Sequence, residues 1–137
     1  MEVVLDGNSL TIEQVVAAAR QGAKVSVSDE ARRKMQKSRD VIEKSVAEGI
    51  AIYGVTTGIG EFARIRIDTE QSAELQRRII YSHSAGTGDP QPEDVVRAAM
   101  TIRANTLAKG YSGVRQKLID TVLGMINKGV IPYINEK

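Results

Sequence analysis

Short apolar runs and helical periodicity alternate along the first third of the chain. Residues 2–5 and 24–27 are short valine-rich runs typical of strands, and the two could pair. Between them, Thr11 with Gln14 three residues later matches a capping box. The apolar positions that follow recur at helical spacing until Gly22. We therefore expect a first helix between the two strands.

Four more apolar stripes at helical spacing predict four more helices. Their predicted starts are Ser28, Asp68 or Thr69, Pro92 and Ser112, and their predicted ends are Gly49, His83, Gly110 and Gly129. The side chains expected to face inward are Ala31, Met35, Ile42 and Val46; Leu75, Ile79 and Ile80; Val95, Val96, Ala99, Met100, Ile102 and Leu107; and Leu118, Ile119, Val122, Leu123 and Ile126. Residues 130–137 lack a helical period and predict an extended segment. The chain is therefore predicted to be mostly α.

Composition narrows the classes of function. With 137 residues, 42% of them hydrophobic, the chain has the size of one ordinary domain and enough apolar residues for a core. The absence of cysteine and the single histidine exclude disulfides, thiolate chemistry and the usual zinc sites, so we predict no metal. The net charge of +2 is spread among acidic residues, so we expect no nucleic-acid partner. No apolar run is long enough for a membrane span or signal peptide, which predicts a cytoplasmic protein without a membrane partner.

A glycine-rich loop at residues 52–61, Ile-Tyr-Gly-Val-Thr-Thr-Gly-Ile-Gly-Glu, is the most informative segment. Its three glycines allow turns and close backbone approach, and its two threonines resist a helix. Tyr53 therefore lies in a loop. Taken alone, Tyr53 could be a packing residue with its hydroxyl at the surface. Gly54 and Gly58 are predicted to be hinge or turn residues.

Two further segments carry candidate residues. His83, the only histidine, lies in Ser82-His83-Ser84-Ala85-Gly86, where a helical pattern reaches a glycine; by itself it could be an ordinary helix-end histidine. Residues 105–115 form the third segment, and we interpret Asn105 and Arg115 within it as architectural.

Together the three segments resemble the N-terminal portion of the aromatic amino-acid ammonia-lyases and 2,3-aminomutases. This family includes histidine, tyrosine and phenylalanine ammonia-lyases and uses a 4-methylidene-imidazole-5-one prosthetic group. The resemblance implies that residues 1–137 are a single partial domain, the helical N-terminal part of an ammonia-lyase-type fold. It also implies that the Ala-Ser-Gly segment that forms the group, and a long helical bundle, lie beyond residue 137 or on a partner chain. A homotetramer is the assembly that it implies.

The resemblance also assigns roles to three residues. Elimination of ammonia needs an electrophile and a base, and Tyr53 matches the family's base. Because a free phenol has a pKa of about 10, such a base needs positive charge or oriented dipoles beside it. Gly60 matches a glycine whose backbone lies against the bound amino acid, although it could equally be a turn glycine. His83 matches a histidine that contacts the substrate's side chain, which argues against phenylalanine as substrate and leaves histidine and tyrosine open.

Three functions follow as alternatives. The first is an ammonia-lyase that converts L-histidine or L-tyrosine to the α,β-unsaturated acid, with this chain supplying the base and a side-chain contact. The second is a tyrosine 2,3-aminomutase, which uses the same machinery to give a β-amino acid. The third is a helical assembly module without catalytic activity.

Overall fold

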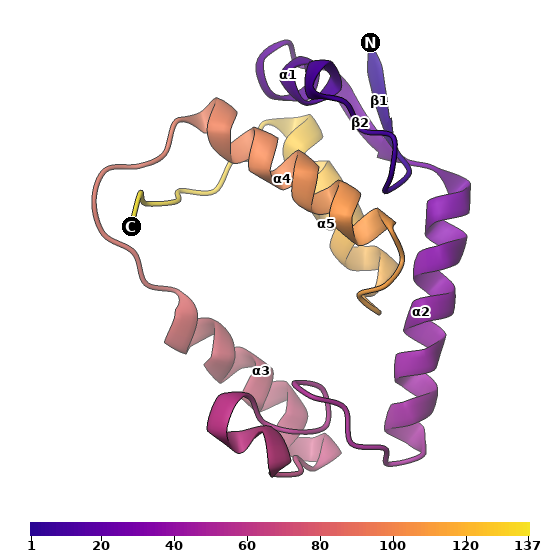
Figure 1. The fold of residues 1–137 in the computed structure, drawn as a ribbon. Helices are drawn as coiled ribbons and strands as arrows, with labels where there is room; N and C mark the ends of the chain where they lie inside the picture. The colour runs from indigo at the N-terminus through magenta and orange to yellow at the C-terminus, as the bar shows by residue number, and fades with distance from the viewer. The chain divides into compact units, whose positions relative to one another are not determined.

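The computed structural model describes residues 1–137, apart from the side chain of residue 69. Over this range it has five α-helices and two short strands, which confirms the mostly α prediction (Figure 1). It also has a short 3-10 helix, η1 (Gly60–Arg64), which the sequence pattern did not predict. The chain divides into two compact units, residues 1–40 with 87–137, and residues 41–86.

The first unit begins with the two predicted strands. β1 (Glu2–Leu5) and β2 (Lys24–Val27) pair in parallel, with Val3 opposite Val25. Parallel strands need a crossover connection, and α1 (Ile12–Arg20) supplies it. The capping box is present, since the Gln14 amide N–H donates to the Thr11 hydroxyl at 3.3 Å. The sequence therefore predicted this strand–helix–strand segment, although not its parallel pairing.

Parts of three further helices complete the core of this unit. They are the first turns of α2 (Asp29–Ala47) and the whole of α4 (Glu93–Ala108) and α5 (Gln116–Lys128). α4 contacts α1 and α5, and α5 contacts β2. The most deeply buried large apolar side chains come from both strands and from α2 and α5, and they are Val3, Leu5, Val25, Met35, Ile119 and Ile126. Residues 130–137 are extended, as predicted, and Asn135 forms an antiparallel bridge with Pro90.

Polar side chains join distant segments of this unit. The side chain of Asn127 accepts from the Val25 N–H and donates to the Val25 carbonyl, each at 2.8 Å, as a neighbouring strand would. Asn105 accepts from the Gly7 N–H at 2.9 Å, which confirms that it is architectural. Arg32 on α2 forms an ion pair with Asp120 on α5 at 2.7 Å.

The predicted start of the last helix was wrong. α5 begins at Gln116 with Arg115 as its N-cap, and not at Ser112. The Gly113 N–H donates to the Ser38 hydroxyl on α2 at 3.0 Å, and Gly113 has a φ of 61°. The hydrogen bond to Ser38 and the left-handed conformation of Gly113 therefore keep this turn outside the helix.

Part of the predicted buried set was also wrong. Val95, Ala99, Ile102 and Leu118 are exposed, as is Ile80 in the second unit. α4 buries Val96 and Leu107 as predicted, together with three small residues that were not predicted, Thr101, Ala104 and Ala108. Thr101 can be buried because its hydroxyl donates to the Arg97 carbonyl at 2.9 Å. The small residues allow α4 to contact its neighbours closely, and this moves the apolar stripe around the helix.

The second unit contains the end of α2, a loop, η1 and α3 (Thr69–His83). α3 starts after Asp68 as predicted, although the Asp68 side chain makes no capping hydrogen bond. Among its described residues, Thr57 and Gly58 are buried and no large apolar side chain is. The hydrogen bonds of the loop therefore define the local structure of this unit more than an apolar core does. No helix in the described part of the chain is long and apolar enough to cross a membrane.

Candidate active site

Two threonine hydroxyls shape the glycine-rich loop from inside. The Thr56 hydroxyl accepts from the Ile52 N–H and donates to the Ile50 carbonyl, each at 2.8 Å. The Thr57 hydroxyl accepts from the Gly54 N–H at 3.3 Å and donates to the Gly58 carbonyl at 3.0 Å. These bonds take the place of a helix or strand ladder for the backbone on both sides of Tyr53.

A following segment anchors the second half of the loop. The Gly58 N–H donates to the Ile65 carbonyl at 3.1 Å, and the Ile67 N–H donates to the Thr56 carbonyl at 3.0 Å. A Cβ on Gly58 would lie 2.6 Å from the Cβ of Phe62, closer than two such atoms approach. Gly58 is therefore a close-approach glycine without a positive φ, so the turn role is wrong for it, while the hinge role stays a prediction. Gly54, with a φ of 70°, is a turn glycine as predicted.

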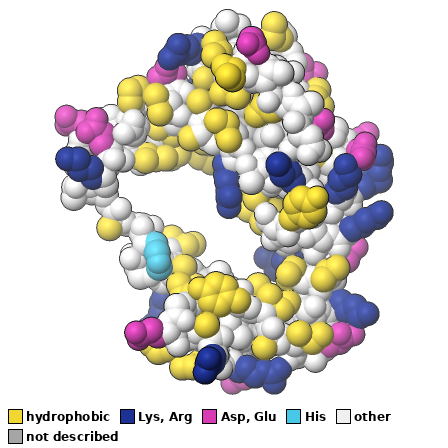
Figure 2. Space-filling view, viewed as in Figure 1, with side chains coloured by type: hydrophobic (Ala, Val, Ile, Leu, Met, Phe, Trp, Pro, Cys, Tyr) yellow, Lys and Arg dark blue, Asp and Glu magenta, His cyan; other side chains and the backbone are white. Residues whose placement is uncertain are grey.

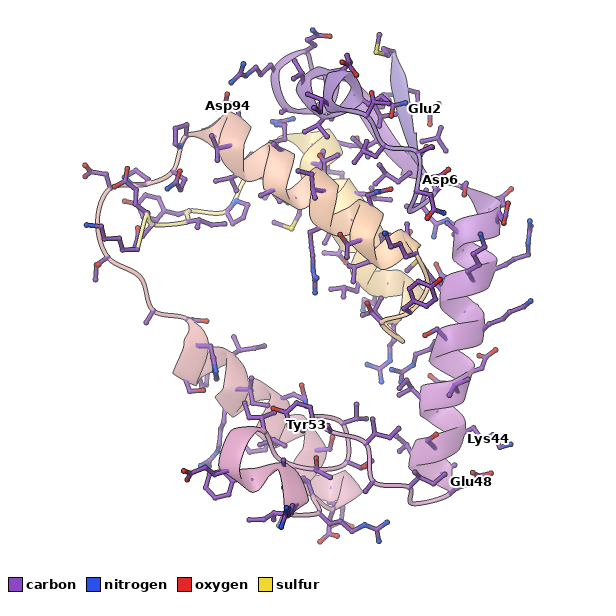
Figure 3. All side chains as sticks on the ribbon, in the orientation of Figure 1. Glu2, Asp6, Lys44, Glu48, Tyr53 and Asp94 are labelled. Carbon is purple, nitrogen blue, oxygen red and sulfur yellow. The ribbon has the colours of Figure 1, made fainter. Side chains whose placement is uncertain are left out.

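The loop brings Tyr53 and Gly60 together. The Gly60 N–H donates to the Tyr53 phenol oxygen at 3.1 Å, and Gly60 has a φ of 58°. The Tyr53 side chain is labelled in Figure 3, and the residue is 65% exposed. A backbone N–H at a phenol oxygen stabilises negative charge on it. The geometry thus offers an accessible phenol with one oriented dipole beside it.

His83 is the last residue of α3 and is exposed, as the single imidazole in Figure 2 shows. Its Nδ1 lies 2.9 Å from the Ile79 carbonyl oxygen and 2.9 Å from the Ser82 hydroxyl. Because a carbonyl oxygen only accepts, we assign to the neutral ring the tautomer with the hydrogen on Nδ1 and the lone pair on Nε2. His83 can therefore offer a hydrogen-bond acceptor to a ligand. Within the described part of the chain its hydrogen bonds stay on α3, and none joins it to Tyr53 or Gly60.

The sequence patterns missed Gln76. Its side-chain amide donates to the Gly54 carbonyl at 3.1 Å, which joins α3 directly to the loop. A spacing of seven residues places Gln76 on the same face of α3 as His83, two turns earlier. That spacing was present in the sequence, but the partner of Gln76 is a backbone group that no residue pattern identifies.

The comparisons with known proteins assign this fold and loop to a family. The sequence profile of the aromatic amino acid lyases matches residues 10–137, so the chain belongs to the aromatic amino acid lyase family. It is similar to the histidine ammonia-lyase of Caldanaerobacter subterraneus subsp. tengcongensis, with 49% identity over 136 residues, which are 99% of this chain and 27% of that relative. The histidine ammonia-lyase of Streptococcus sanguinis is 47% identical over 97% of this chain and 26% of its own. The chain therefore spans about a quarter of the length of these relatives.

Solved structures give the same fold. The tyrosine aminomutase from Streptomyces globisporus matches all of this chain and 26% of its own, with a TM-score of 0.95 and 42% identity. The histidine ammonia-lyase from Trypanosoma cruzi also matches all of this chain and 26% of its own, with a TM-score of 0.91 and 38% identity. The predicted ammonia-lyase-type fold is thereby confirmed.

Proposed function

We propose that this chain is part of an ammonia-lyase that eliminates ammonia from L-histidine and releases the α,β-unsaturated acid. The observation that carries the proposal is the accessible Tyr53 phenol, which accepts from the Gly60 N–H at 3.1 Å. Membership of the aromatic amino acid lyase family supports it, as do the histidine ammonia-lyases at 47% and 49% identity.

Tyr53 acts as the base in this proposal. The β-hydrogen of an amino acid is not acidic, so its removal requires a base held beside the β-carbon. The proton passes from the β-carbon to the Tyr53 oxygen, and the Gly60 N–H stabilises the phenolate that receives it. The contact of the Gly60 N–H with the phenol supports the predicted place of the Gly60 backbone beside a substrate that Tyr53 contacts.

The electrophile comes from outside these residues. The sequence contains no Ala-Ser-Gly tripeptide, so the 4-methylidene-imidazole-5-one group would form on a continuation of the chain or on a partner chain. When bound, the group would supply the electrophile that makes the substrate's amine a leaving group. The residues of this chain fit a site in which the base and the electrophile come from different segments, because the exposed side of Tyr53 is open to a substrate bound by the segment that carries the electrophile.

His83 selects the substrate's side chain. With Nδ1 directed at the Ile79 carbonyl, Nε2 accepts a hydrogen bond from an imidazole N–H or a phenol O–H. The ring of phenylalanine has no such donor. The geometry therefore favours histidine or tyrosine over phenylalanine. The two bacterial histidine ammonia-lyases, at 49% and 47% identity against 42% for the tyrosine aminomutase, favour histidine.

The second candidate is a tyrosine 2,3-aminomutase, in which the ammonia returns to the β-carbon. It is favoured by a specific observation, the TM-score of 0.95 and 42% identity to a tyrosine aminomutase. The third alternative is a helical module that has lost catalytic activity. That function does not account for the hydrogen bond between Gly60 and Tyr53. The single partial domain, the homotetramer and the cytoplasmic location belong to the same proposal.

The products distinguish these functions. The complete enzyme is incubated separately with histidine, tyrosine and phenylalanine, while absorbance follows the unsaturated acid and chromatography follows the β-amino acid. We expect the unsaturated acid from histidine. A β-amino acid from tyrosine would establish the aminomutase instead, and the absence of turnover with all three would contradict both enzyme assignments.

A further inference from the structure

We propose that Gln76 is a positioning residue that holds the Tyr53 loop on α3 and so keeps the base at its working distance from the substrate. This inference rests on the proposed function, since it concerns the placement of the proposed base. Its direct observation is the hydrogen bond from the Gln76 side-chain amide to the Gly54 carbonyl, at 3.1 Å.

The position of Gly54 gives this bond its effect. Gly54 follows Tyr53 directly in the chain, and its φ of 70° forms the turn that the backbone makes immediately after the tyrosine. Its N–H donates to the Thr57 hydroxyl inside the loop, while its carbonyl accepts from α3. The two peptide units that flank the Gly54 Cα are therefore each held, the one that joins Tyr53 to Gly54 from within the loop and the next one from the helix.

The same helix carries His83. Gln76 and His83 are seven residues apart, so they lie on one face of α3, separated by about 10 Å along its axis. A rigid helix sets that separation. Gln76 consequently ties the loop that carries the base to the helix that carries the proposed side-chain contact. A substrate that reaches both would find Tyr53 and His83 at a fixed separation.

The energetics indicate a role in positioning more than in stability. The Gln76–Gly54 bond is exposed, and an exposed hydrogen bond contributes little net stability because water replaces it. A misplaced catalytic group, in contrast, lowers the rate steeply, by about 100-fold for a shift of about 1 Å. Loss of the Gln76 donor should thus alter catalysis without unfolding the protein.

The test uses the complete enzyme with Gln76→Met, which keeps the length of the side chain and removes the donor. Gln76→Glu is a second variant, nearly isosteric and unable to donate when ionised. The matched control is Gln71→Met on the same helix, because Gln71 is exposed and its side chain makes no hydrogen bond to the described residues. Thermal unfolding establishes that each variant folds.

Two measurements follow on these variants. The first is amide hydrogen exchange in the peptide covering residues 52–59, which should become faster in both Gln76 variants and not in Gln71→Met. The second is turnover of substrate labelled with deuterium at the β-carbon. We expect kcat to fall about 10- to 100-fold with a smaller change in KM, and the primary isotope effect on kcat to rise, because proton transfer to a misplaced base becomes the slow step.

The outcomes separate this inference from the proposed function. If the parent enzyme turns over and the Gln76 variants behave as Gln71→Met does, Gln76 does not position the base. A fall in kcat with unchanged loop exchange and an unchanged isotope effect would also overturn the inference. If the parent enzyme is inactive with every amino acid, the proposed function fails, while faster exchange in the Gln76 variants would still show that Gln76 holds the loop.

Discussion

The contact between Tyr53 and Gly60 places a side chain and a backbone group of one loop in the same site. Gly60 has a φ of 58°, and a Cβ added to it would meet nothing within 4 Å in this chain. Space therefore does not explain a glycine here. The positive φ does, and contact with a substrate would add a second reason.

Gly60→Ala separates these two reasons. An alanine at positive φ costs about 1–2 kcal/mol of loop stability whether or not substrate is near. Gly54→Ala is the matched control, because Gly54 has a φ of 70° and a Cβ there would lie at an ordinary 3.6 Å from Ile59. If Gly60 lies against the substrate, its substitution should raise KM more than that of Gly54. Equal values of KM in steady-state kinetics would reduce Gly60 to a turn residue.

His83→Phe tests the acceptor role of the imidazole. Removing it leaves the polar end of a histidine or tyrosine substrate unpaired, which should lower kcat/KM by about 1–3 kcal/mol in free-energy terms. Phenylalanine has no group to pair and should lose less, or gain. The ratio of kcat/KM among the three amino acids measures this effect. An equal fall for all three would assign His83 to structure or to the shared chemistry.

At the scale of elements, Asn127 extends the two-stranded sheet without adding a strand. Its side chain pairs with both polar groups of Val25, a residue only 2% exposed. Asn127→Ala would leave a buried donor and acceptor unsatisfied, so the free energy of unfolding should fall by about 1–3 kcal/mol. Asn8→Ala is the control, because Asn8 is exposed and its side chain makes no hydrogen bond to the described residues. Equal denaturation midpoints for the Asn127→Ala and Asn8→Ala variants would show that water replaces the Asn127 side chain without loss of stability.

The elements that the sequence predicted well are those that local chemistry determines. The capping box at Thr11 and the left-handed Gly129 lie next to the helix ends that they specify. The predictions failed where a distant residue decides the outcome. The Ser38 hydroxyl moves the start of α5, and close contact between helices through small residues leaves Val95 and Ile102 exposed.

The site follows the same division. The glycines and threonines of the loop, together with the family resemblance, single out Tyr53, Gly60 and His83. The sequence could not show that the Gly60 N–H reaches the phenol, nor that Gln76 binds the Gly54 carbonyl, because both contacts involve backbone groups. The proposed catalytic roles of these residues stay predictions.

At the scale of the whole molecule, the second unit, which carries Tyr53, differs from the first because none of its described large apolar side chains is buried. Val41, Ile50, Phe62 and Ile65 of the second unit are all about half exposed or more, with values from 48% to 63%. Exposed apolar groups of this kind commonly mark a surface that other protein covers. The chain spans about a quarter of the length of its relatives, so the complete enzyme is the object to test.

The most direct test is the rate of the complete enzyme with histidine after Tyr53→Phe, followed by the absorbance of the unsaturated acid. This substitution keeps the ring and removes the base, so kcat should fall by about two to four powers of ten with little change in unfolding. Tyr81→Phe is the matched control, because Tyr81 is 72% exposed and its phenol makes no hydrogen bond to the described residues. A Tyr53→Phe rate within about tenfold of the parent would contradict the account and move the base to another residue.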